Sequence, residues 1–393
     1  MTRLPKLDPA VAETRAAVRS ALRNALASLA DAGRGAEDRP LVLVALSGGA
    51  DSLALAAAAA FEALRAGMRA GAVIVDHGLQ EGSAGVAERA AEQARRLGLD
   101  PVLVRRVVVA GDSPPVARST DAVRRTTGEE SSGRAGARAN PGPEAAAREA
   151  RYEALEAAIS ETGAIRLLTG HTRDDQAEQV LLALARGSGS RALAGIPPRR
   201  GAILRPLLGV SRATTEQACE AQGLEPWRDP HNADPAFTRV RVRERVLPVL
   251  ERELGPGVSD ALARTAELAR EDADALDALA ESLADGMIDV ETIDVGMIDA
   301  ESLADPEPGG AVRLSIPVGG LAEQPPALRN RVIRLAAERL CGAHLSREHT
   351  LAVASLVADW RGQGPVFVPG LRVSRSEGRL VFERQIGSPR RGG

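Results

Sequence analysis

A short glycine-rich segment, Ser47–Ser52 (SGGADS), directly follows the apolar run 41–46 (LVLVAL). Its glycines let the backbone turn tightly and approach an anion, and a helix that starts there offers unpaired N–H groups and a partial positive charge. Asp51 would repel a phosphate unless a divalent cation lay between them, so the segment predicts a phosphate site with magnesium. It is not a Walker A loop, because the spacing differs and the lysine is missing. The predicted phosphate-site residues are Ser47, Gly48, Gly49, Ala50, Asp51 and Ser52.

A second polar segment, 170–178 (GHTRDDQAE), opens a predicted helix after another short apolar run. Asp175 and Glu178 are three residues apart, so they lie on one side of that helix. With His171 in the preceding turn, they could hold magnesium and move protons near a phosphate. Helix capping explains the first acidic residues, but it does not require His171 or Glu178. We take Asp51 and Asp175 as the metal ligands.

Three other positions are weaker candidates. Asp76 ends a predicted strand, where a carboxylate often meets a ribose or a base edge, although helix capping would explain it equally well. Arg148 and Arg151 lie three apart on a predicted helix and could clamp a phosphate or offset charge in a transition state. The chain has one lysine among 50 basic residues, hence 49 arginines, so a solvent-exposed role is the default for any single one.

The segment 227–250 combines rare aromatic residues with a compact row of arginines. Arg239, Arg241 and Arg243 alternate with valines ahead of a proline, and only 2% of the chain is aromatic. An RNA backbone is the natural partner of such a patch, whereas a solvated helix face is the plainer alternative.

The elements that must position these residues alternate between apolar runs and helical periodicity. Buried strands separated by helices predict βαβ units and an α/β fold with a doubly wound parallel sheet. A smaller, mostly helical C-terminal domain is expected to follow. The predicted strands of the first part are 41–46, 72–76, 102–109 and 165–169, and the predicted helices are 11–30, 84–97, 145–162 and 174–186.

The predicted organisation has three parts. Residues 1–40 are expected to form an N-terminal helix and lead-in, 41–250 the α/β domain that carries the predicted phosphate site, and 255–385 the C-terminal domain. Residues 111–143 lack apolar periodicity and are read as a disordered insertion. Residues 281–310 contain the short repeats ESLAD and GMID twice each and are read as an acidic insertion, since repeats this short do not form a solenoid.

Composition limits the function classes. A chain of 393 residues is too long for a single compact domain. Its formal net charge of −3 excludes a positive electrostatic field over the whole protein, so any RNA binding must come from a local patch. Two distant cysteines exclude a disulfide framework and a cysteine-held cluster or zinc. No leader segment or 18-residue apolar run is present, so we expect a cytoplasmic protein without a membrane partner.

Taken in order, these motifs resemble the tRNA(Ile)-lysidine synthetase family of the PP-loop (N-type) ATP pyrophosphatases, whose core is adenine nucleotide alpha-hydrolase-like. The glycine-rich loop alone indicates only the superfamily. The family is indicated by its combination with VDHGL (75–79), REARY (148–152), the 170–189 segment, RPLL (205–208) and WRDPHNAD (227–234). The resemblance to the family covers residues 41–252, and a weaker similarity continues to residue 382. The chain is similar to members without the second C-terminal domain of longer ones.

The resemblance implies a reaction on a CAU-anticodon tRNA(Ile). ATP would adenylate C2 of the wobble cytidine, and free L-lysine would then displace AMP to give lysidine. It implies that Ser47–Ser52 bind the pyrophosphate of ATP with Asp51 on Mg²⁺. Asp76 joins the nucleotide-contacting set. The residues implied around the α-phosphate and lysine are Arg151, His171, Asp175 and Glu178, and those implied for the tRNA are Arg148, Asn232, Arg239, Arg241 and Arg243.

Two alternatives stay open. Another PP-loop tRNA-modifying enzyme, such as a thiolase, would need cysteines that Cys219 and Cys341 do not supply in a suitable pattern. The other is an inactive nucleotide-binding or tRNA-binding module. The sequence leaves open the oligomeric state, a homodimer included, the metal stoichiometry, which carboxylate holds lysine, the role of the two insertions, and how tRNA(Ile) is distinguished from tRNA(Met).

Overall fold

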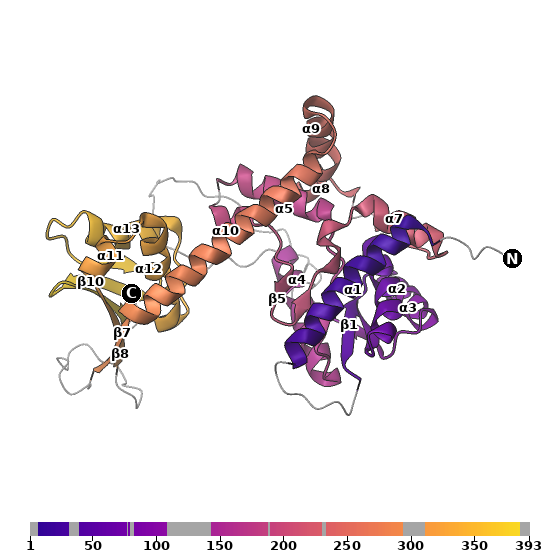
Figure 1. The fold of residues 1–393 in the computed structure, drawn as a ribbon, viewed down its shortest axis with the longest axis horizontal. Helices are drawn as coiled ribbons and strands as arrows, with labels where there is room; N and C mark the ends of the chain where they lie inside the picture. Colours follow the sequence, from indigo (N-terminus) through magenta and orange to yellow (C-terminus); the bar gives the residue numbers. More distant parts are fainter. Residues whose placement is uncertain are drawn as a thin grey trace, which may run out of the picture. The chain divides into compact units, whose positions relative to one another are not determined.

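The computed structural model describes residues 7–30, 39–76, 78, 82–107, 143–187, 189–229, 233–293 and 311–385. The chain divides into two compact units, Met1–Glu267 and Leu268–Gly393 (Figure 1). The expected disordered insertion lies outside these residues, apart from its last residue, which begins a helix.

Unit 1 is built on a six-stranded sheet with the order β3-β2-β1-β4-β6-β5. All pairs are parallel except β5 with β6. The order reverses direction at β1, so the crevice between β1 and β4 is where ligands bind in sheets of this kind. The strands are β1 (Leu41–Ala45), β2 (Arg69–Asp76), β3 (Val102–Arg106), β4 (Arg166–Leu168), β5 (Arg199–Arg200) and β6 (Ile203–Leu204).

Both faces of this sheet are covered by helices, which explains why β1 is apolar throughout. Val42 and Val44 point into the core formed with α1, α2, α3 and α7, while Leu41 and Leu43 point into the core against α4. The predicted doubly wound α/β fold is therefore confirmed. The helices are α1 (Pro9–Ala30), α2 (Ala50–Arg65), α3 (Ser83–Arg96), α4 (Pro143–Thr162), α5 (Arg173–Ala185), α6 (Ser190–Leu193) and α7 (Arg212–Ala221).

Short helical pieces complete the unit. They are the 3₁₀ turn η1 (Pro206–Gly209), α8 (Thr238–Arg241), the π-helical turn η3 (Val242–Val246), α9 (Leu247–Leu254) and the first turns of α10 (Val258–Met287). The boundary between the units falls inside α10, whereas the sequence analysis expected it at 250–255.

Unit 2 combines helices with an antiparallel sheet of order β7-β8-β11-β10-β9. The sequence analysis expected a mostly helical domain here, and the structure adds this five-stranded sheet to its helices. The helices and one face of the sheet enclose an apolar core that includes Ile316, Val332 and Phe382. The elements are β7 (Asp289–Ile293), β8 (Ala311–Pro317), α11 (Val318–Ala322), α12 (Pro326–Cys341), α13 (Arg347–Ala358), β9 (Val366–Val368), β10 (Leu371–Ser376) and β11 (Arg379–Arg384).

The acidic insertion expected at 281–310 requires correction in its first half. Residues 281–287 form the end of α10, and 289–293 form β7, which pairs with β8. Asp289 forms an ion pair with Arg379 on β11, and Glu291 forms one with Arg313 on the adjacent strand β8. The acidic residues therefore belong to the sheet of unit 2, and 294–310 lie outside the described residues.

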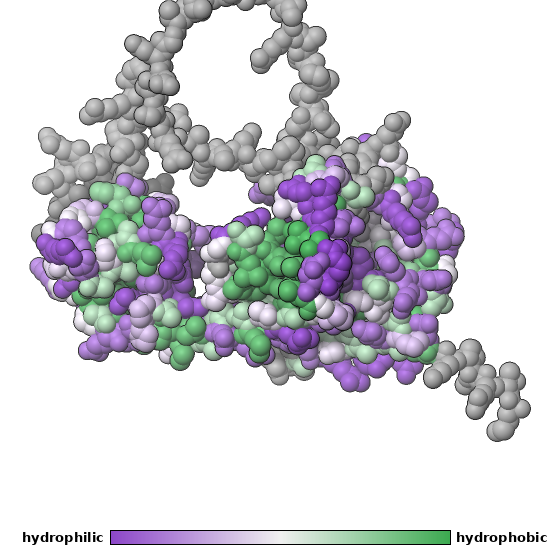
Figure 2. All heavy atoms as spheres, turned by 90° about the horizontal axis from the view of Figure 1, so that it is seen from above, coloured by the Kyte–Doolittle hydropathy of each residue, from purple (hydrophilic) through white to green (hydrophobic). Residues whose placement is uncertain are grey.

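Hydrophilic side chains cover most of the face seen in Figure 2, with one larger apolar area among them. Exposed apolar side chains in unit 1 include Leu184 on α5 and Leu254 on α9. Within the described part of the chain, no helix is both long and apolar enough to cross a bilayer.

Candidate active site

The glycine-rich loop turns sharply from β1 into α2. Gly48 has φ +86°, a left-handed conformation that favours glycine, and its carbonyl accepts a hydrogen bond from the Trp227 N–H at 2.9 Å. The Ser52 hydroxyl accepts from the Ser47 N–H at 3.2 Å and lies 3.1 Å from the Ser47 hydroxyl. Gly49 is the N-cap of α2 and has no side chain to occupy the first N–H groups of that helix. The loop therefore has the geometry of an anion cradle.

Gly170 brings the segment after β4 against this loop. A Cβ atom at Gly170 would lie 3.0 Å from the carbonyl carbon of Asp51 and 3.1 Å from the Ser52 nitrogen. Both are backbone atoms, which cannot move aside cheaply. The absence of a side chain at this position lets the two predicted polar segments meet at one edge of the sheet.

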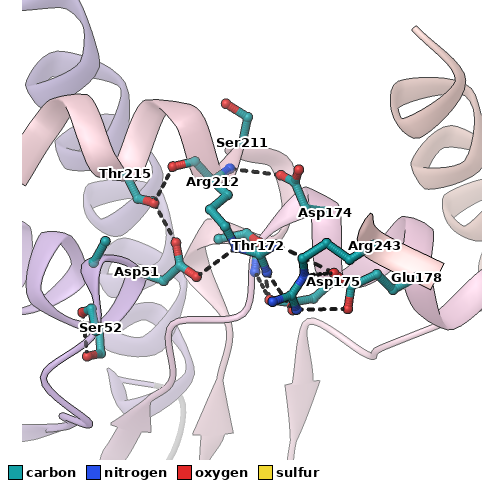
Figure 3. Close-up of polar contacts among 12 residues, drawn as sticks. Asp51, Ser52, Thr172, Asp174, Asp175, Glu178, Ser211, Arg212, Thr215 and Arg243 are labelled. Carbon is teal, nitrogen blue, oxygen red and sulfur yellow. Dashed lines mark hydrogen bonds and ion pairs between the residues drawn. The ribbon is translucent and has the colours of Figure 1, made fainter. Parts of the chain in front are cut away.

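Arg212 joins the two segments (Figure 3). Its guanidinium lies 3.5 Å from Asp51 Oδ2, 3.1 Å from Asp175 Oδ1 and 3.5 Å from Glu178 Oε1. Its backbone N–H donates to Asp174 Oδ2 at 2.8 Å, which fixes the start of α7. Three carboxylates from α2 and α5, the helices that follow β1 and β4, thus converge on one cation.

Glu178 is fully buried on α5 and organises the neighbouring arginines. Arg243 Nε donates to its Oε1 at 2.7 Å and Arg243 Nη2 to its Oε2 at 3.2 Å. Arg239 Nε lies 3.6 Å from Oε2, in addition to the contact with Arg212. One buried carboxylate therefore contacts three guanidinium groups. These contacts hold the three arginine side chains beside the site.

Two side chains complete the contacts of the carboxylates. The Thr215 hydroxyl donates to Asp51 Oδ1. The backbone N–H of Thr172 donates to Asp175 Oδ2 at 2.8 Å, with the Thr172 hydroxyl 3.1 Å from the same oxygen, so Thr172 and Asp175 form a capping box at the start of α5.

The environment separates the proton affinities of the acidic groups. Burial raises the pKa of Asp51 above its usual value, and the Thr215 hydrogen bond and Arg212 offset this only in part. Burial also acts to raise the pKa of Asp175, but Arg212 and the Thr172 N–H lower it below the usual value. The pKa of Arg212 is raised by the carboxylates despite its burial, so it remains a cation.

His171 faces the same region from the turn after β4. Burial lowers its pKa to about 4; Asp175 opposes this, while Arg205, Arg239 and Arg151 add to it. Its Nδ1 lies 3.1 Å from the Thr169 hydroxyl. At neutral pH the imidazole is therefore uncharged.

The cluster fits a magnesium ion that is shared with a substrate. Asp51 and Asp175 present one oxygen each to the same cation, Arg212. No group of three His, Cys, Asp or Glu side chains in the described ranges is arranged to hold a metal alone. Mg²⁺ is commonly held by one or two carboxylates together with substrate phosphates, which is the mode that Asp51 and Asp175 suit.

The other predicted residues are distributed around this cluster. Asp76 is buried at the end of β2, and its Oδ1 accepts from the Gly78 N–H at 3.0 Å. Arg148 and Arg151 lie on α4, their guanidinium carbons 5.3 and 5.9 Å from the centre of the Tyr152 ring. Asn232 lies outside the described residues.

Arg241 differs from its neighbours in the arginine row. Its side chain donates to the carbonyl oxygens of Pro235 and Ala236, both at 2.7 Å, and to the Thr238 hydroxyl at 2.9 Å. Arg239 and Arg243 are four residues apart on the helical turns of α8 and η3 and both contact Glu178, while Arg241 stabilises the preceding turn. Its predicted contact with tRNA stays a prediction.

Sequence reasoning missed Arg212 and Thr215. A serine N-cap, Ser211, marks the start of their helix, but nothing local distinguishes this arginine from 48 others. Their role emerges only from the packing of α7 beside the loop.

Comparisons with known proteins identify the family of this chain. A family model described as PP-loop domain matches residues 18–250, and one described as TilS substrate binding domain matches 316–381. The tRNA(Ile)-lysidine synthase of Leifsonia xyli subsp. xyli is 55% identical over 342 residues, covering 87% of this chain and 89% of that protein. That of Salinispora tropica is 51% identical over 379 residues, covering 95% and 97%.

The chain belongs to the tRNA(Ile)-lysidine synthase family. The resemblance drawn from the ordered motifs is confirmed. The PP-loop match spans the glycine-rich loop and the carboxylate cluster of this chain, and the second match lies within unit 2. Among solved structures, a U34-tRNA thiolase from Methanococcus maripaludis aligns with a TM-score of 0.47 at 18% identity, covering 66% of this chain and 80% of the thiolase.

Proposed function

We propose that this member of the tRNA(Ile)-lysidine synthase family attaches L-lysine to the wobble cytidine of a CAU-anticodon tRNA(Ile), with ATP and Mg²⁺, releasing AMP and pyrophosphate. It is then an ATP-dependent ligase that forms a C–N bond in the cytoplasm. The supporting observation is the convergence of Asp51, Asp175 and Glu178 on Arg212 beside an anion-binding loop.

In the first step the C2 oxygen of the cytidine attacks the α-phosphorus of ATP. A new P–O bond forms, and the bond to pyrophosphate breaks. Residues 47–52 and the start of α2 bind the departing pyrophosphate. Arg212 and Arg151 offset the negative charge that grows on the α-phosphate oxygens. Mg²⁺ held by Asp51 and Asp175 would supply further charge neutralisation when bound.

In the second step an amine of L-lysine attacks C2 of the adenylated base. A C–N bond forms, the C2–O bond breaks, and AMP leaves with that oxygen. The attacking nitrogen must lose a proton, and we assign the uptake of that proton to His171, which is uncharged at neutral pH. Glu178 keeps the arginines in place, since its oxygens are engaged by Arg212, Arg239 and Arg243.

The thiolase alternative is disfavoured by the state of Cys219. Its Sγ donates to the Ala50 carbonyl at 3.3 Å, and burial together with Asp51 raises its pKa to about 12. Sulfur transfer requires a thiolate, which this environment opposes.

The experiment is incubation of the purified chain with ATP, magnesium, labelled L-lysine and a tRNA(Ile) transcript with a CAU anticodon. We expect lysine in the RNA and matching amounts of AMP and pyrophosphate, with both lost in Asp51→Ala. Omission of lysine should leave adenylated tRNA. If folded protein forms neither AMP nor lysine-containing RNA, the chain is an inactive binding module instead.

A further inference from the structure

A basic cavity of about 530 Å³ lies beside the carboxylate cluster in unit 1. That volume suits one small ligand, since such pockets span roughly 300–1,000 Å³. Its described lining contains five arginines and no aspartate or glutamate. The arginines are Arg148, Arg186, Arg200, Arg205 and Arg239. A cavity with this charge needs negative charge from its occupant.

Arg205, which follows β6, is the buried centre of this charge. The residue is only 6% exposed, and its Nη1 donates to the Pro197 carbonyl at 2.8 Å. Its Nε is buried without a hydrogen-bond partner in the described part of the protein. An unpaired buried donor is costly, so an acceptor on a bound ligand would relieve it. Burial lowers the pKa of Arg205, as do the nearby charges of Arg200 and Arg148, while Tyr152 opposes the shift.

The cavity also contains two aromatic side chains, Tyr152 and Phe237, in a chain with only seven aromatic residues. Unpaired RNA bases stack on aromatic rings and on arginine planes. None of the residues 47–52 lines the cavity, whereas His171 and Arg239 belong to both the cavity and the site. The cavity is therefore adjacent to the pyrophosphate loop and distinct from it.

We propose that this cavity binds one unpaired RNA nucleotide together with a flanking phosphate, and that Arg205 and Arg200 are its phosphate-binding residues. The inference rests on the proposed function and assigns residues of the tRNA-binding site: the nucleotide enters from the β6 side while ATP occupies the β1 side. A duplex does not fit a cavity of this size, so the occupant comes from a loop of the RNA.

The test is equilibrium binding of a fluorescent CAU anticodon stem-loop, without ATP or lysine, across a range of salt concentrations. Arg200→Gln should weaken binding about tenfold and reduce the slope of log K against log salt by about 0.7, the value for one single-strand phosphate contact. Arg205→Lys keeps the charge but loses Nε, and we expect a similar weakening.

Arg199→Gln is the matched control, because adjacent strand residues point to opposite faces and Arg199 does not line the cavity. It should bind as wild type. If Arg205→Lys does not fold, the comparison of Arg200→Gln with Arg199→Gln tests the inference by itself. Wild-type binding by the cavity variants, or weakened binding of ATP only, overturns the inference. If these variants lose RNA binding while wild type makes no lysidine, the cavity assignment stands and the proposed function fails.

Discussion

Arg212 is the cation on which the carboxylates of the site depend. Replacing it with glutamine leaves Asp51, Asp175 and Glu178 facing one another without this counter-charge. Because a fixed positive charge at the reacting phosphate is lost as well, Arg212→Gln should reduce tRNA-dependent AMP formation about a hundredfold. Arg173→Gln is the control, since Arg173 pairs with Asp260 away from the cluster. An unchanged kcat in the folded variant would show that Arg212 is only structural.

His171 gives the site a measurable pH dependence. Its pKa of about 4 in the folded protein lies below the usual 6.5, so between these values the unfolded chain binds a proton that the folded one does not. The free energy of unfolding should therefore fall as pH drops from 7 to 5, by about 2 kcal/mol from this residue. Urea unfolding at pH 7 and pH 5 should show that His171→Gln loses less unfolding free energy than wild type between these two pH values. Equal losses in both proteins would contradict the assignment.

At the scale of elements, Gly170 sets the distance between the loop and the second polar segment. Gly170→Ala places a methyl group against the backbone of Asp51 and Ser52. We expect a loss of about 1–3 kcal/mol in unfolding free energy and weaker ATP binding, measured by denaturation and calorimetry. Gly209→Ala is the control, since nothing lies within 4 Å of its added Cβ. Similar effects in the two variants would dismiss close approach as the cause.

The elements of unit 1 were predictable because each has a strong local signal. The apolar run 41–46 and the glycines after it predict a buried strand and a loop, and spacing places Asp175 and Glu178 on one helix face. The two-residue strands β5 and β6 have too short a pattern to recognise. β7 was missed because Asp289 and Glu291 look like surface residues until their cross-strand arginines are known.

For the whole molecule, the division into compact units differs from the expected domain boundary at 250–255, because the first turns of α10 belong to unit 1. Gly255 and Gly257 have φ of +92° and +98° and end the helical structure before α10. In the sequence these glycines indicate a linker between domains. The first turns of α10 nevertheless pack on unit 1, where Asp260 pairs with Arg173 at 2.8 Å and Ala266 is buried. Local breaks in a sequence do not reveal such tertiary contacts.

Two units also predict two calorimetric transitions. A non-hydrolysable ATP analogue with magnesium should raise the transition of unit 1 alone, because it contains the loop. At a hundredfold excess over Kd the added stability is about 2.7 kcal/mol. A single transition for the whole chain that shifts when the analogue is added would contradict the division into two units. The absence of any shift in wild type, as in Asp51→Ala, would contradict ATP binding by unit 1.

The central claim is that this site joins lysine to one particular base. The most direct measurement is nucleoside mass spectrometry of tRNA(Ile) with a CAU anticodon after reaction with the purified chain, ATP, magnesium and isotopically labelled L-lysine. The account predicts that the wobble cytidine alone is converted to its lysine adduct, and that the label is absent with Asp51→Ala. Label on another nucleoside, or AMP release with the wobble cytidine unchanged, would contradict it.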